Sequence, residues 1–153
     1  MPRFEGQYEE TFTVDAPLKV VADHFGDLDT IAANYGPLLR FERIGDDTLH
    51  LILEPKSEKG VTFNGEQKCR WQRPSDDVLT WDTAETRNMW SKGRATFTAV
   101  GENRTRVHFS QNITTEMQVN RLLAKVIQPI VKREIAKGVQ QYLERMRKSL
   151  RAK

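Results

Sequence analysis

Four uncharged polar residues alternate with apolar residues, so strand geometry places them on the inner side of predicted strands: Gln67, Thr83, Ser91 and Gln111. A buried polar group must find a hydrogen-bond partner or lose free energy. One interpretation pairs these groups with each other, with water or with the rim of a sheet. The other makes them the few polar groups that orient a ligand in an otherwise apolar pocket. The sequence leaves both interpretations open.

Two carboxyl groups add the option of proton transfer. Glu85 lies on the same inner side if the alternation of its strand extends that far, and Glu10 interrupts the apolar face of the first predicted strand. A desolvated carboxyl group has a raised pKa and can serve as a general acid or base. Glu85 is therefore the candidate catalytic residue, with Glu10 as a second choice.

Other routes to chemistry lack residues in the required pattern. The three histidines, His24, His50 and His108, have no metal-ligand spacing such as i, i+4. Cys69 is the single cysteine and is expected to be a small buried side chain. The chain contains no nucleophile elbow, phosphate-binding glycine loop or dinucleotide fingerprint. We expect no metal and no cofactor.

Length and charge limit the class of protein. The 153 residues suit one domain over 1–153, and neither a secretory signal nor a run of eighteen apolar residues occurs, so we expect a cytoplasmic protein without a transmembrane segment. From residue 119 onward the chain has ten Lys or Arg residues and two Glu residues, a net charge of +8. The rest of the chain has a net charge of −5. We interpret the basic part as a solvated helix face. Transient contact with an anionic membrane is the alternative, and nucleic acid is not expected because no aromatic residues interleave with these cations.

The stretch 117–153 predicts the element around which the chain is organised. Its apolar residues recur at spacings of three, four and one, the pattern of one long amphipathic helix. Pro129 predicts a kink in this helix, and Gly138 predicts a second position at which the helix can bend. Such a helix is stable only against a wide partner surface.

That surface is a predicted antiparallel sheet. A strand over 8–14 precedes a helix that starts at Asp15-Ala16-Pro17 and a second short helix capped by Asp27. The apolar period then changes to two, which predicts six more strands, around 39–41, 49–53, 61–72, 79–83, 89–99 and 107–113. Short loops between them favour antiparallel neighbours.

This order resembles the helix-grip fold of the START-like, or SRPBCC, superfamily, which includes birch-pollen-allergen-like proteins and the polyketide cyclase/dehydrase and lipid-transport group. The similar segments are Asp15-Ala16-Pro17, Gly36-Pro37-Leu38, Gly93-Arg94-Ala95-Thr96-Phe97, Asn103-Arg104-Thr105-Arg106-Val107 and Ile127-Gln128-Pro129-Ile130-Val131-Lys132-Arg133. The resemblance implies an α+β fold in which a curved seven-stranded sheet and a kinked C-terminal helix enclose a hydrophobic cavity. It also implies that the cavity holds a lipid, isoprenoid or polyketide-like molecule.

Strand parity and the helix stripe predict the residues that surround this cavity and bind the ligand. They are Phe63, Gln67, Trp71, Trp81, Thr83, Met89, Phe97, Phe109, Gln111, Ile113, Leu123, Ile127, Ile130 and Val131.

We favour a module that binds or carries a hydrophobic small molecule over an enzyme, because no catalytic constellation is present. One alternative is a cyclase, aromatase or dehydratase in which the same cavity folds a reactive chain and one carboxylate moves a proton. Another is a protein-interaction module that uses the outer sheet face or the basic helix. The sequence specifies neither the ligand nor the oligomeric state.

Overall fold

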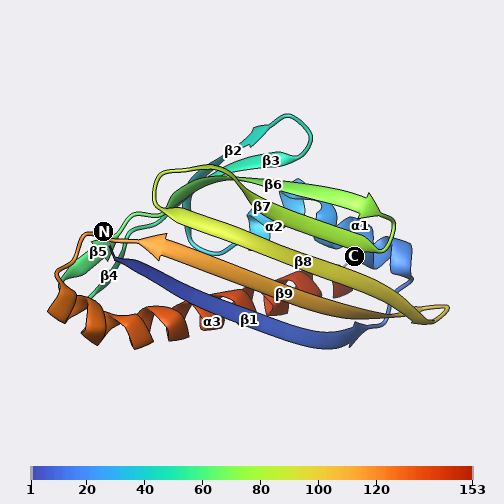
Figure 1. Ribbon diagram of the computed structural model, residues 1–153. Coiled ribbons are helices and arrows are strands. Elements are labelled where there is room, and N and C mark those ends of the chain that lie inside the picture. The colour runs from blue at the N-terminus through green and yellow to red at the C-terminus, as the bar shows by residue number, and fades with distance from the viewer. Residues whose placement is uncertain (1, 153) are drawn as a thin grey trace.

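The computed structural model describes residues 2–152 and shows a curved sheet with one long helix lying along it (Figure 1). The elements in chain order are β1 (Arg3–Val14), α1 (Leu18–Gly26), α2 (Leu28–Asn34), β2 (Leu38–Ile44), β3 (Thr48–Leu53), β4 (Lys56–Glu58), β5 (Val61–Phe63), β6 (Glu66–Ser75), β7 (Val78–Thr86), β8 (Met89–Gly101), β9 (Arg104–Glu116) and α3 (Arg121–Arg151). Seven strands form one antiparallel sheet in the order β1-β9-β8-β7-β6-β3-β2. The α+β helix-grip prediction is confirmed.

The two short helices begin by different means. Asp27 caps α2 as predicted, because its side chain accepts a hydrogen bond of 3.0 Å from the backbone N–H of Thr30. The segment Asp15-Ala16-Pro17 offers the Asp15 carboxylate as an N-cap for α1, and this expectation is wrong: α1 starts after Pro17, and no side chain caps it. The carboxylate of Asp15 instead lies in solvent, 3.8 Å from the guanidinium of Arg104.

The prediction of one continuous strand over 61–72 is wrong, because this segment forms two separate strands, β5 and β6. Val61–Phe63 pairs with Lys56–Glu58 as a separate two-stranded hairpin, and β6 begins only at Glu66. Gly65 separates the two strands, and a Cβ atom there would lie 2.8 Å from the ring of Phe63. The absence of a side chain at Gly65 lets this ring lie against the backbone, which alternation of side chains does not predict.

Helix α3 is shorter at its start than predicted. Asn120 ends the preceding loop, and its side chain accepts a hydrogen bond of 2.8 Å from the backbone N–H of Leu123. The helix then continues through Pro129 and Gly138 to Arg151. The predicted end at Lys153 lies outside the described residues, and a kink at Pro129 stays a prediction.

The hydrophobic core has two parts. The larger cluster joins α1 and α2 to the sheet and to the second half of α3, through residues such as Phe25, Phe97 and Leu143. The smaller cluster contains Phe4, Met117 and Ile127, around the start of α3. Figure 1 shows α3 running along the sheet from the β4–β5 hairpin toward α1 and α2. The buried residues of α3 are confined to these two regions, so the helix is anchored at both ends.

The sheet and α3 come into close contact at Gly6 of β1. A Cβ atom at this position would lie 2.7 Å from both Cβ and Cγ2 of Ile135, a distance at which something must move. Because these are branched side-chain atoms near the helix backbone, they have little freedom to move away. Gly6 therefore sets how closely α3 packs on the edge strand.

We predict that Gly6→Ala lowers the free energy of unfolding by about 1–3 kcal/mol, because the added methyl group overpacks this contact. Urea denaturation monitored by tryptophan fluorescence measures the change. Gly101→Ala is the matched control, since its Cβ would lie at an ordinary 3.5 Å from Cβ of Arg104. Equal stabilities for both variants would show that the contact at Ile135 does not constrain the helix.

Candidate functional site

A cavity of about 480 Å³ lies between the inner face of the sheet and α3. Strands β3, β6, β7, β8 and β9 supply one wall, and the stripe of α3 from Ile127 to Arg145 supplies the other. The inner surface is mainly aliphatic and aromatic, with contributions from both parts of the core. The core is thus divided by a space that protein side chains do not fill.

The structure brings ten of the predicted ligand-binding residues to the wall of this cavity. They are Phe63, Trp71, Trp81, Met89, Phe109, Gln111, Ile113, Ile127, Ile130 and Val131. Placement at the wall is what the coordinates show, and ligand binding by these residues stays a prediction.

Four predicted residues, Gln67, Thr83, Phe97 and Leu123, do not reach the wall. Phe97 is buried against Phe25 in the larger core cluster, with ring centroids 6.0 Å apart. Leu123 packs in the small cluster at the start of α3. The alternation of side chains along β8 correctly placed Phe97 on the inner face of the sheet. Alternation does not show which part of a strand borders the cavity, so it could not tell that Phe97 lies outside it.

The other two belong to a polar network behind the wall. The hydroxyl of Thr83 donates to Oε1 of Gln67 at 2.7 Å, and Nε2 of Gln67 donates to Oγ of Ser91 at 2.9 Å and to Oη of Tyr35 at 3.1 Å. The backbone N–H of Ser91 donates back to Thr83 Oγ1 at 2.7 Å. The first interpretation of the inward polar groups therefore holds for Gln67 and Thr83, whereas Ser91 also faces the cavity.

Gln111 has a different partner. Its Oε1 accepts a hydrogen bond of 2.7 Å from Nε1 of Trp81, whose ring centroid lies 5.0 Å from that of Phe109. The indole of Trp81 lies directly against the backbone of Gly93 in β8. A Cβ atom at Gly93 would come within 2.2 Å of the ring, so a larger residue would displace the indole. The floor of the cavity thus depends on a glycine that lets Trp81 lie along the sheet.

Neither candidate carboxylate reaches the cavity. A β-bulge between Lys68 and Cys69 shifts the register of β6 and β7, so Glu85 faces outward, 3.3 Å from Nζ of Lys68 and 72% exposed. Glu10 accepts hydrogen bonds from the Tyr8 hydroxyl at 2.7 Å and from Arg147 at 3.0 Å. The prediction of Glu85 as an inward acid or base is wrong, because the alternation on which it depended stops at the bulge.

The histidines occupy separate surroundings. His50 lies 2.8 Å from Glu66 and His108 lies 3.4 Å from Glu9, whereas His24 is buried beside the end of α3. Within residues 2–152 no three His, Cys, Asp or Glu side chains gather in a group suited to a metal ion.

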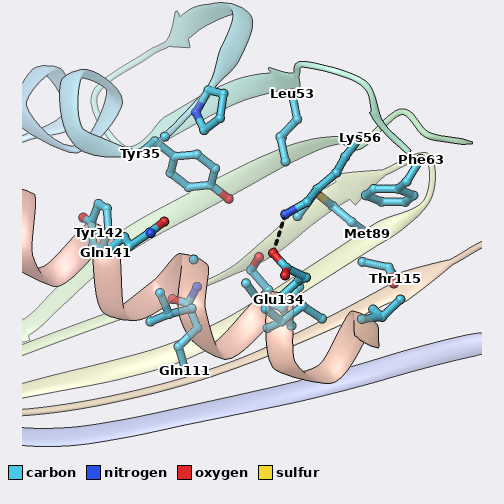
Figure 2. Close-up of a pocket in the computed structure, with 18 of the residues that line it drawn as sticks. Tyr35, Leu53, Lys56, Phe63, Met89, Gln111, Thr115, Glu134, Gln141 and Tyr142 are labelled. Carbon is cyan, nitrogen blue, oxygen red and sulfur yellow. Dashed lines mark hydrogen bonds and ion pairs between the residues drawn. The ribbon is translucent and has the colours of Figure 1, made fainter. Parts of the chain in front are cut away.

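Sequence reasoning missed an ion pair across the cavity. Nζ of Lys56, from the β4–β5 hairpin, lies 2.9 Å from Oε2 of Glu134 on α3, as Figure 2 shows. The hydrogen bond from the Lys56 ammonium group holds the pKa of the Glu134 carboxyl below its ordinary value, so this carboxyl is ionised at neutral pH. No local pattern relates residues 78 positions apart, so nothing in the sequence indicated this pair.

It also missed two tyrosines. Tyr35, at the end of α2, and Tyr142, on α3, line the cavity with their rings edge to face at 6.3 Å. Burial raises the pKa of both phenols, so both carry their protons at neutral pH. Tyr142 belongs to the apolar stripe of the helix and could have been found from it, whereas Tyr35 stands in a loop sequence without periodicity.

Comparison with known proteins supports the fold and goes no further. No protein-family model matches the chain, and no curated protein sequence matches it. Solved structures do match. A START superfamily protein from Mycobacterium smegmatis has a TM-score of 0.69 at 12% identity, covering 95% of this chain and 97% of that one. The chain has the START-like helix-grip fold.

Two enzymes share this fold. An aromatase/cyclase from a Streptomyces species matches with a TM-score of 0.68 at 12% identity, over 96% of this chain and 94% of that chain. Norcoclaurine synthase from Thalictrum flavum, in complex with dopamine and hydroxybenzaldehyde, matches with a TM-score of 0.63 at 11% identity, over 97% and 87%. At such identities the likeness extends to the backbone and not to the chemistry of the site.

We predict that Gln67→Leu lowers the free energy of unfolding by about 1–3 kcal/mol, because it removes the 2.7 Å acceptor of the half-buried Thr83 hydroxyl and leaves only a contact of 3.4 Å to the Ser91 carbonyl oxygen. The comparison is Gln111→Leu, which should cost less because the freed indole N–H of Trp81 lies at the cavity, where water can reach it. Chemical denaturation of both variants gives the two values. A Gln67→Leu protein as stable as the wild type would contradict the network.

Proposed function

We propose that this chain binds a hydrophobic small molecule in the cavity between the sheet and α3. The observation that carries the proposal is a space of about 480 Å³ with mainly apolar walls between the sheet and α3. Protein interiors rarely leave voids larger than a water molecule, whereas ligand sites commonly enclose about 300–1,000 Å³. A lipid, an isoprenoid or a polyketide-like molecule suits such walls.

Gly138 gives independent support. Among the helix residues at the wall it occupies the middle of the stripe, with Glu134 and Ile135 on one side and Gln141 and Tyr142 on the other. A Cβ atom there would meet no other atom within 4 Å. Glycine inside a helix costs about 1 kcal/mol relative to alanine, and packing does not require it here. Gly138 is exposed and leaves the helix side of the cavity wall open at this point, which gives a ligand additional room.

The carrier hypothesis is favoured over the enzyme hypothesis. The enzyme hypothesis relied on Glu85, which lies on the outer face beside Lys68. Three carboxylates line the cavity: Glu54, Glu58 and Glu134. Glu134 is paired with Lys56, which lowers the pKa of its carboxyl group and keeps it ionised at neutral pH. Binding as proposed needs only the apolar walls and a few polar groups, with no cofactor.

Membrane contact through the basic helix also stays a prediction. Leu122 and Val126 of α3 are 77% and 50% exposed, and Arg121 and Lys125 stand next to them in sequence. Apolar side chains beside cations suit the surface of an anionic bilayer, from which an apolar ligand could be taken up. No helix within residues 2–152 has the length and apolar character needed to cross a bilayer. A cytoplasmic location stays an expectation.

We predict that Gly138→Leu abolishes or strongly weakens binding of a lipophilic probe, because the new side chain projects into the cavity. Fluorescence titration with anilinonaphthalene sulfonate measures the affinity, and quenching or a blue shift of emission from Trp71 and Trp81 at the wall provides a second signal. Unfolding in urea should show no loss of stability, since leucine favours the helix more than glycine does.

Gly138→Ala is the matched control, because a methyl group adds little volume and should leave probe binding close to that of the wild type. A Gly138→Leu protein that binds the probe as well as the control does would place the probe elsewhere and contradict the cavity as the binding site.

A further inference from the structure

The polar network behind the cavity has a fixed direction of hydrogen bonding. A backbone N–H can only donate, so Thr83 Oγ1 is the acceptor in its 2.7 Å contact with the Ser91 backbone. The Thr83 hydroxyl then sends its own proton to Gln67 Oε1 at 2.7 Å. The reversed amide orientation would leave that proton only the longer contact of 3.4 Å to the Ser91 carbonyl oxygen. The backbone of β8 therefore orients the Gln67 side chain.

This orientation determines what Tyr35 can do. Nε2 of Gln67 has two protons, and they go to Ser91 Oγ and to Tyr35 Oη. The Tyr35 oxygen is thus an acceptor toward Gln67. The phenol proton has to point away from this amide N–H, because an N–H group cannot accept it. No hydrogen bond within residues 2–152 has the Tyr35 hydroxyl as its donor.

The free direction leads into the cavity. Figure 2 shows the Tyr35 ring at the cavity with its hydroxyl group directed inward. Burial keeps the phenol protonated, since it raises the pKa, and a phenol whose oxygen already accepts hydrogen bonds is a stronger donor through cooperative polarisation. An apolar molecule that fills the cavity would leave this donor without a partner, at a cost in free energy.

We propose that Tyr35 donates a hydrogen bond to a carbonyl oxygen of the ligand, so that the cavity selects apolar molecules that carry a carbonyl group near α2. The inference rests on the proposed function, because it names the class of ligand for the same cavity. A neutral acceptor is specified because no charged side chain is hydrogen-bonded to Tyr35 or Ser91 within residues 2–152. Ser91 and Gln67 are positioning residues, since they act on the ligand through Tyr35.

Fluorenone and fluorene test this proposal, because they have nearly the same shape and differ by one carbonyl oxygen. Affinities are measured by displacement of anilinonaphthalene sulfonate from the wild type, from Tyr35→Phe and from Tyr8→Phe. Tyr8 is a matched control because its hydroxyl is bonded to Glu10. We expect Tyr35→Phe to bind fluorenone about three- to tenfold more weakly, the worth of one hydrogen bond, and to bind fluorene as the wild type does. Tyr8→Phe should change neither affinity.

The infrared carbonyl stretch of bound fluorenone gives a readout that a structural role for Tyr35 would not change. In the wild type it should lie below its value in hexane, and Tyr35→Phe should move it back. This measurement on the wild type alone decides the matter if Tyr35→Phe does not fold. A stretch equal to that in hexane, or equal fluorenone affinities for the wild type and Tyr35→Phe, would overturn the inference while leaving cavity binding intact. If neither compound binds to the wild type, the proposed function fails and the inference with it.

Discussion

Helix α3 has to bury an apolar stripe against the sheet at both ends without closing the space between them, and the rest of the structure depends on this constraint. Ile127 at one end and Leu143 with Met146 at the other are almost completely buried, whereas most wall residues between them, with the exception of Val139, are partly or largely exposed. Close contact of Gly6 with Ile135 fixes the height of the helix above β1. The cavity is the space that remains between α3 and the inner face of strands β3, β6, β7, β8 and β9 while the helix packs on the edge strand β1.

Glycines act in opposite ways around this cavity. Gly93 has no side chain, and the ring of Trp81 occupies the place where its Cβ atom would be. Gly138 also removes a side chain, but nothing in the described chain occupies the place of its Cβ atom. Packing explains the first glycine and does not explain the second, which agrees with the proposed binding of a ligand. This contrast is the structural reason for regarding the cavity as functional.

The sequence predicted the architecture well, because amphipathic period and turn residues act locally. It predicted the helix stripe, the order of strands and the inward face of most cavity residues. It failed where a position depends on distant parts of the chain. The bulge that turns Glu85 outward, the pairing of Lys56 with Glu134 and the burial of Tyr35 all depend on partners far away in sequence. Parity also cannot tell a residue at the cavity, such as Phe109, from one in solid core, such as Phe97.

The central claim is that the space beneath α3 is a ligand site, and native mass spectrometry tests it most directly. Freshly purified protein, and protein incubated with a total lipid extract and then desalted, are measured under native and denaturing conditions. We predict a native mass that exceeds the chain by that of one small molecule, which is released on denaturation. A native mass equal to that of the chain alone, both before and after incubation, would contradict the account.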